Sequence, residues 1–111
     1  MKTQKEITED KRFQHIQKGE DGGSGFATIK GQIFSVVYSY GGGWDHVSVS
    51  LRNRCPTWAE MCAIKDMFFK ADETCVEYHP AESDYVNMHP FCLHIWRCQD
   101  AEMPKPPKIY V

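Results

Sequence analysis

The sequence predicts an α+β fold, a mainly antiparallel sheet with one main helix packed on one of its faces. Three observations support this prediction: a β-hairpin pattern over residues 32–52, a capped amphipathic helix directly after it, and two alternating segments after the helix. With 111 residues, 41% of them hydrophobic, the chain has room for a single domain over residues 1–111 with one core of modest size.

The hairpin gives the clearest β signal. The segment "QIFSVVYSY" (32–40) is rich in β-branched and aromatic residues, the glycines of 41–43 permit a tight reversal, and "WDHVSVSLR" (44–52) alternates strictly. Upstream, "RFQHIQK" (12–18) alternates enough to predict a short edge strand.

The main helix is predicted within "CPTWAEMCAIKDMFFKAD" (55–72). Thr57 and Glu60 have the spacing of a capping box, in which each side chain bonds the backbone N–H of the other residue. At about 100° per residue an apolar arc forms, and Met67 falls away from it. The arc consists of Trp58, Met61, Cys62, Ile64, Phe68 and Phe69.

Two further strands are expected after the helix. "TCVEYHP" (74–80) and "FCLHIWRC" (91–98) both alternate, and the turn-forming residues of "AESDYVNM" (81–88) separate them. The expected order is therefore β-β-α-β-β after the short edge strand.

Three segments are expected to lack regular structure. Residues 1–10 are charged and polar and are predicted to be flexible. The glycines and acids of 18–25 predict a turn or loop. Residues 99–111 form a Pro-rich C-terminal segment, in which 104–108 should run extended and 109–111 should add a final strand or pack on the surface.

Composition excludes several classes of function. A formal net charge of −2 gives no global basic field, so non-specific nucleic-acid binding is disfavoured. No apolar stretch is long enough for a membrane span, and the charged start lacks the apolar region of a signal peptide, so we expect a cytoplasmic protein. The five cysteines are odd in number and form no CxxC pair, which favours free thiols.

Strand alternation predicts a polar face on the sheet. If the later strands share a sheet with the hairpin, the helix covers their aliphatic residues and a second set gathers on the opposite face. That set is His46, Ser48, Glu77, His79, His94 and Trp96. Such a face is a solvated surface, a self-association surface or a binding cleft.

Metal binding and catalysis have weaker support. His79, His89, Cys92 and His94 offer zinc-ligating atoms, but their spacing matches no recognised zinc pattern, so no metal or cofactor is expected. "HVS" (46–48) has the His-x-Ser form of two-histidine phosphoesterases. The second copy, "HIW" (94–96), has an indole where the hydroxyl belongs, so His46, Ser48 and His94 would be the catalytic residues only if the protein is an enzyme.

Binding of a ligand or a protein partner is the favoured functional hypothesis. Aromatic, amide and guanidinium groups beside the histidines can stack on and hydrogen bond to an anionic or nucleotide-like ligand. The predicted contact residues are His46, Ser48, His79, Tyr85, Asn87, His94, Trp96 and Arg97.

Four linked motifs resemble a family of small uncharacterised proteins encoded by bacteriophages and prophages. These motifs are W-D-H-V-S-V-S, R-C-P-T-W-x-E-M, Y-H-P and H-P-x-C-L-H-x-W-R, within residues 26–111. The resemblance implies an accessory protein in the cytoplasm of the bacterial host, and it assigns no activity. It favours a non-catalytic homodimer that binds a host protein or a small anionic ligand and so counters host defence, with a structural or assembly protein as a further alternative.

Overall fold

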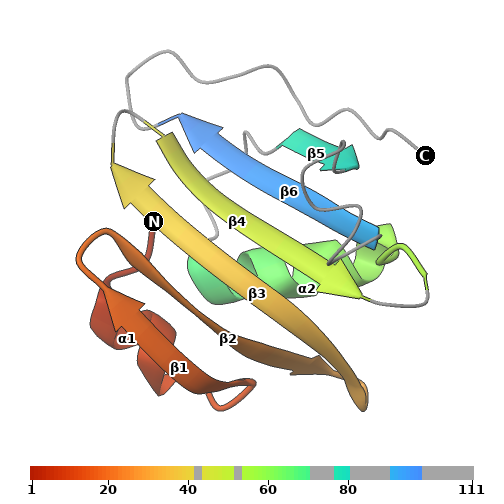
Figure 1. Ribbon diagram of the computed structural model, residues 1–111, viewed down its shortest axis with the longest axis horizontal. Coiled ribbons are helices and arrows are strands. Elements are labelled where there is room, and N and C mark those ends of the chain that lie inside the picture. The colour runs from red at the N-terminus through yellow and green to blue at the C-terminus, as the bar shows by residue number, and fades with distance from the viewer. Residues whose placement is uncertain (42–43, 52–53, 71–76, 81–90, 99–111) are drawn as a thin grey trace.

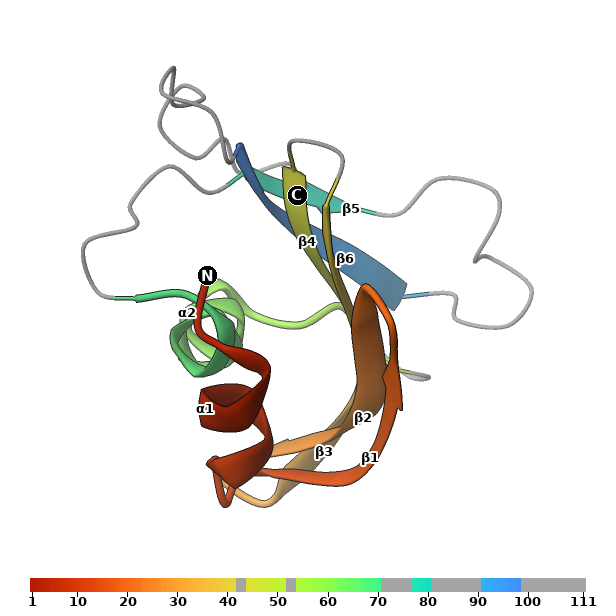
Figure 2. The same ribbon diagram turned by 90° about the vertical axis from the view of Figure 1, so that its left-hand side faces the viewer.

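The computed structural model describes residues 1–41, 44–51, 54–70, 77–80 and 91–98. Within these residues, six strands form one antiparallel sheet in the order β1-β2-β3-β4-β6-β5, and the two helices lie on the same face of it (Figures 1 and 2). The strands are β1 (Phe13–Gly19), β2 (Gly22–Ile29), β3 (Gln32–Gly41), β4 (Trp44–Leu51), β5 (Glu77–Pro80) and β6 (Phe91–Cys98); the helices are α1 (Gln4–Glu9) and α2 (Trp58–Phe68). The predicted α+β class with the main helix on one face is confirmed.

The predicted hairpin is present as β3 and β4. Its register pairs Val36 with Val49 and Tyr38 with Val47, and all four of these side chains are buried beneath the helices. The strict alternation of β4 thus directs its aliphatic residues into the core, as the sequence indicated. In the described part of the chain, no helix is long and apolar enough to cross a membrane.

Strand β2 was not predicted as a separate element, because its glycines were taken for a loop over 18–25. Only Glu20 and Asp21 make the turn, and the glycines that follow pair with β1 and β3. They are required for close packing: a Cβ at Gly23 would lie 2.7 Å from the Tyr38 hydroxyl, and one at Gly25 would lie 2.8 Å from the Phe13 ring.

Helix α1 corrects the expectation of a flexible N-terminus. Thr3 and Glu6 form a capping box, with the Glu6 N–H donating to Thr3 Oγ1 at 3.2 Å and the Thr3 N–H donating to Glu6 Oε1 at 3.1 Å. Ile7 is completely buried, and the Lys2 N–H donates to the Phe68 carbonyl at 2.8 Å. A capped turn with an apolar anchor therefore holds the first residues on the core.

The core is centred on three aromatic rings where α1 and α2 meet the sheet. Phe13 lies 5.9 Å from Tyr38 and 5.4 Å from Phe68, and Tyr38 lies 5.1 Å from Phe68, measured between ring centroids. The buried Tyr38 hydroxyl accepts a hydrogen bond from the Gln4 amide at 2.6 Å, and burial raises its pKa. This ring cluster joins residues that are far apart in the sequence.

Helix α2 has the predicted capping box, and four residues of the predicted arc are buried: Met61, Ile64, Phe68 and Phe69. The buried residues of α2 are Met61, Ile64, Met67 and Phe68. Met67, which was placed away from the core, is fully buried, whereas Trp58 is 38% exposed. The side chain of Lys65 reaches Asp66, with Nζ 3.2 Å from Oδ1, so its ammonium group is paired at the edge of the core.

Candidate functional site

The candidate site occupies the face of the sheet opposite to the two described helices, α1 and α2. In β4 the side chains of Val47, Val49 and Leu51 are buried in the core under α1 and α2. The alternate residues His46 and Ser48 therefore belong to the opposite face. This half of the face is formed by β4, β6 and β5, which lie side by side (Figure 1).

The register assembles the predicted polar set into two neighbouring rows across these three strands. His46 pairs with Trp96, which pairs with Glu77. Ser48 pairs with His94, which pairs with His79. Directly opposed residues in an antiparallel sheet belong to the same face, so these positions form one surface, which we call the histidine face.

The three remaining predicted contact residues are not among the paired positions that form the histidine face. Arg97 pairs with Asp45, which is 2% exposed and whose carboxylate lies 3.7 Å from the amino group of Met1, so this register position belongs to the helix-covered face. Tyr85 and Asn87 lie outside the described residues, as does His89.

The β4 side chains of the histidine face are packed. His46 is half-buried and Ser48 is only 5% exposed, although both described helices lie on the other side of the sheet, and both residues have interaction partners in the fold. A ligand on this face would therefore meet His46 more readily than the Ser48 hydroxyl. This geometry suits binding through an imidazole better than a reaction that needs an open serine.

Metal binding would use histidines and Cys92 of β5 and β6, and thiol chemistry would need a cysteine that forms a thiolate. The register sets His79 opposite His94, and Cys92 precedes His94 by two residues and so shares its face. Among the described residues, no group of three or more His, Cys, Asp or Glu side chains is placed to hold a metal ion. In α2, burial raises the pKa of Cys62 and so disfavours its reactive thiolate.

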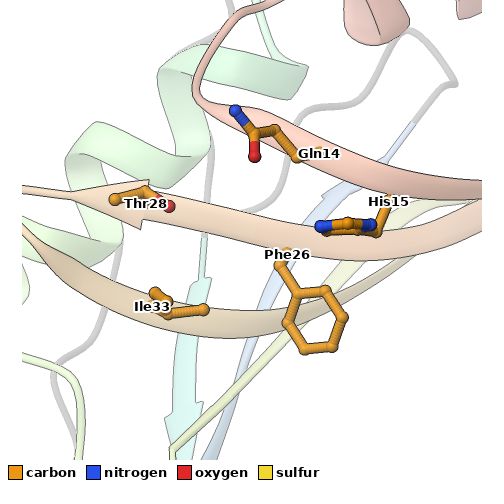
Figure 3. A pocket seen from close by; sticks show the side chains of 5 residues that line it. All are labelled: Gln14, His15, Phe26, Thr28 and Ile33. Atoms are coloured by element: carbon orange, nitrogen blue, oxygen red, sulfur yellow. The ribbon is translucent and has the colours of Figure 1, made fainter.

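A hollow that the sequence did not indicate lies on the same side of the sheet, over β1, β2 and β3. Its volume is about 290 Å³ and it is lined by Gln14, His15, Phe26, Thr28 and Ile33 (Figure 3). The sequence contains one indication of this hollow, the spacing of the apolar residues Phe13 and Ile16. Both pack on the core although they are three residues apart, and a regular strand cannot place residues with that spacing on one face. That spacing indicates a β-bulge, and the register shifts between Gln14 and Gln17.

Comparison with known protein families shows a match over part of the chain. Residues 36–100 match the family described as Domain of unknown function (DUF7694). No curated protein and no solved structure matches the chain. The matched residues begin within β3 and end just beyond β6, so they contain the histidine face and exclude α1, β1, β2 and the hollow.

Proposed function

This chain belongs to the family described as Domain of unknown function (DUF7694), and we propose that it is a non-catalytic binding protein. Its ligand is a host protein or a small anionic, nucleotide-like molecule that docks on the histidine face. The bacteriophage resemblance of its motifs supports an accessory role in the bacterial cytoplasm, in which such binding counters host defence.

The register of β4, β6 and β5 is the observation that carries this proposal. It brings residues from three separate segments into the rows His46–Trp96–Glu77 and Ser48–His94–His79. Imidazole groups can donate and accept hydrogen bonds, and an indole adds a flat surface for stacking. Residue types with complementary binding chemistry are therefore adjacent in the fold although they are distant in the sequence.

The test is native mass spectrometry of the whole chain after incubation with an extract of infected bacteria. The wild-type protein should carry a discrete added mass, and the double variant His46→Ala/His94→Ala should fold cooperatively without it. Gln17→Ala, at an exposed position of β1, is the control and should retain the added mass. A double variant that binds as well as the wild type would contradict the proposal that the ligand docks on the histidine face.

The contact set can be narrowed by three single substitutions. Tyr85→Ala and Asn87→Ala test the predicted contacts that lie outside the described residues. Arg97→Ala should weaken binding less than His46→Ala, because the register sets Arg97 opposite the buried Asp45 and not in the histidine rows. An equal loss would place the guanidinium in contact with the ligand.

A histidine-dependent phosphodiesterase is the second candidate, and one observation favours it. The register sets Ser48 directly opposite His94, with His46 on the same face of β4. An enzyme of this kind would turn over bis(p-nitrophenyl) phosphate and would lose that turnover in His46→Ala and in His94→Ala singly. Such a result would replace the binding proposal.

Self-association, as a homodimer or in a larger assembly, has support on the same side of the sheet. Phe26, Ile33 and Val37 are large apolar residues exposed by 43%, 58% and 52%. Exposed apolar area of this kind often marks a protein interface. Sedimentation velocity over a range of concentrations tests it, and a monomer at every concentration would argue against both a dimer and an assembly role.

A further inference from the structure

The bulge in β1 gives the hollow its unusual lining. In a regular strand consecutive side chains point to opposite faces, yet Gln14 and His15 both line the hollow. The shift in register at this point re-aims His15, whose φ of 55° is rare for a residue with a side chain. The imidazole then meets the Phe26 ring edge-on, at 6.1 Å between centroids and 80° between planes.

The size of the hollow limits what it can hold. A volume of about 290 Å³ lies at the lower end of the range of roughly 300–1,000 Å³ for small-molecule sites. One planar ring fits such a space, whereas a dinucleotide or a peptide segment does not. The Phe26 ring is 43% exposed and Ile33 is 58% exposed, so both offer apolar surface to an incoming ring.

We propose that this hollow binds the base of a free nucleotide, with the base packed against Phe26 and its polar edge bonded by the surrounding side chains. Gln14, His15 and Thr28 each carry a group that can donate and accept hydrogen bonds, which matches the mixed donors and acceptors of a nucleobase edge. A second copy of this chain would need only the apolar atoms of Phe26 and Ile33, whereas a nucleobase would also use the polar groups of Gln14, His15 and Thr28. The site goes beyond the function proposed above, because none of its residues belongs to the histidine face.

Charge at this end of the sheet suits the phosphate of the nucleotide. Lys11 and Arg12 directly precede β1, and Lys30 occupies the turn that follows Thr28 and Ile29. The backbone joins these segments, since the Thr28 N–H donates to the Arg12 carbonyl at 2.9 Å. The Arg12 guanidinium is bonded to the Asp10 carboxylate at 3.1 and 2.8 Å, so the charges of this pair offset each other and the positive charge for a phosphate comes from Lys11 and Lys30.

The experiment is saturation-transfer NMR and titration of the whole chain with AMP, GMP, CMP and UMP in turn. At least one should bind, with saturation strongest on its base protons. Phe26→Ala should weaken binding about tenfold or more, the effect typical of losing one base–aromatic stack. His15→Gly should weaken it as much without loss of stability, because glycine adopts a φ of 55° without strain.

Val37→Ala is the matched control, since Val37 is an exposed apolar residue of the same sheet face outside the hollow, and its affinity should equal that of the wild type. The double variant His46→Ala/His94→Ala should also bind normally, which separates this site from the histidine face. The proposal is overturned if none of the four nucleotides binds, or if Phe26→Ala and His15→Gly bind as the wild type does. Equal binding of ribose 5-phosphate, or of N-acetyltyrosinamide as a mimic of a protein side chain, would overturn it as well.

Discussion

Replacement of Glu60 by glutamine tests the ion pair at the start of α2. The Glu60 carboxylate accepts hydrogen bonds from the two Nη atoms of Arg54 at 2.7 and 2.8 Å, and from the Thr57 N–H at 2.9 Å. The bonds from Arg54 are the main reason that the pKa of Glu60 falls from 4.5 to about 2. Glutamine keeps a carbonyl oxygen for the Thr57 N–H but removes the charge that Arg54 binds.

The expected loss in the free energy of unfolding follows from the pKa of Glu60 and from the exposure of Arg54. A pKa lowered from 4.5 to about 2 sets an upper limit of roughly 3 kcal/mol, at about 1.4 kcal/mol for each tenfold change in binding of the proton. The side chain of Arg54 is 41% exposed, so solvent screening reduces the gain, and we expect Glu60→Gln to lower the free energy of unfolding by about 1 kcal/mol at neutral pH. In a domain of this size that loss lowers Tm by about 5 °C.

The sign of the pH dependence is fixed by the direction of the shift. Because folding lowers the pKa of Glu60, its stabilisation is complete above about pH 4.5 and is lost as the pH falls toward about 2. Urea unfolding of wild type and variant across this window should show a difference that shrinks as the pH falls. No difference at neutral pH, or one that persists unchanged at the acid end of the window, would refute the reasoning. Arg54→Met should give the same pattern and add nothing to Glu60→Gln.

Three further predictions concern the core and are measured by chemical unfolding. Ile7→Ala should cost about 2–5 kcal/mol because Ile7 is fully buried; a cost near zero would mean that α1 is detached in solution. Gly23→Ala should cost about 1–3 kcal/mol, since the new Cβ would lie 2.7 Å from the Tyr38 hydroxyl, and an unchanged stability would contradict that close approach. Met67→Ala should destabilise more than Trp58→Ala, because Met67 is fully buried and Trp58 is 38% exposed. The reverse order would mean that Trp58 faces the core and Met67 does not, as the sequence pattern predicts.

Helix α2 shows how far a periodic pattern can predict packing. The capping box of Thr57 and Glu60 was predicted because both its residue types and its spacing are local. The predicted arc is wrong at Trp58, which is exposed, and at Met67, which is buried but was left out of it; Phe69 is buried as predicted. Phe69 is the C-cap, with an extended backbone at ψ 145°, and Trp58 is exposed at the first helical position. Without Trp58 the centre of the arc moves toward Met67.

The N-terminal elements were harder to predict because their sequence signals oppose one another. The charged residues of α1 suggested a flexible segment, although Thr3 and Glu6 already had capping-box spacing. In β2 the glycines suggested a loop, whereas Gly23 and Gly25 make room for side chains of neighbouring strands. The need for a glycine at these positions arises from the packing of neighbouring strands, so it cannot be predicted from a local sequence pattern.

The histidine face was predictable because strict alternation in β4 and β6 sorts residues into faces before any pairing is known. The pairing itself was an assumption, and the sequence did not show that β6 would lie between β4 and β5. The direct opposition of Ser48 to His94, and of His94 to His79, depends on that order. Arg97 was included for its charge, although the same alternation already assigned it to the aliphatic side.

The residues matched by the family do not hold a complete core. Ile7, Phe13, Ala27 and Phe34 are all buried, and all precede the matched residues 36–100. Phe13 also contacts Phe68, a buried ring of the matched part, at 5.4 Å. A fragment restricted to 36–100 would expose that ring and turn β3 into an unprotected edge strand. Binding at the histidine face therefore has to be assayed on the whole chain, because a fragment that fails to bind would report the loss of this core and not the absence of a ligand.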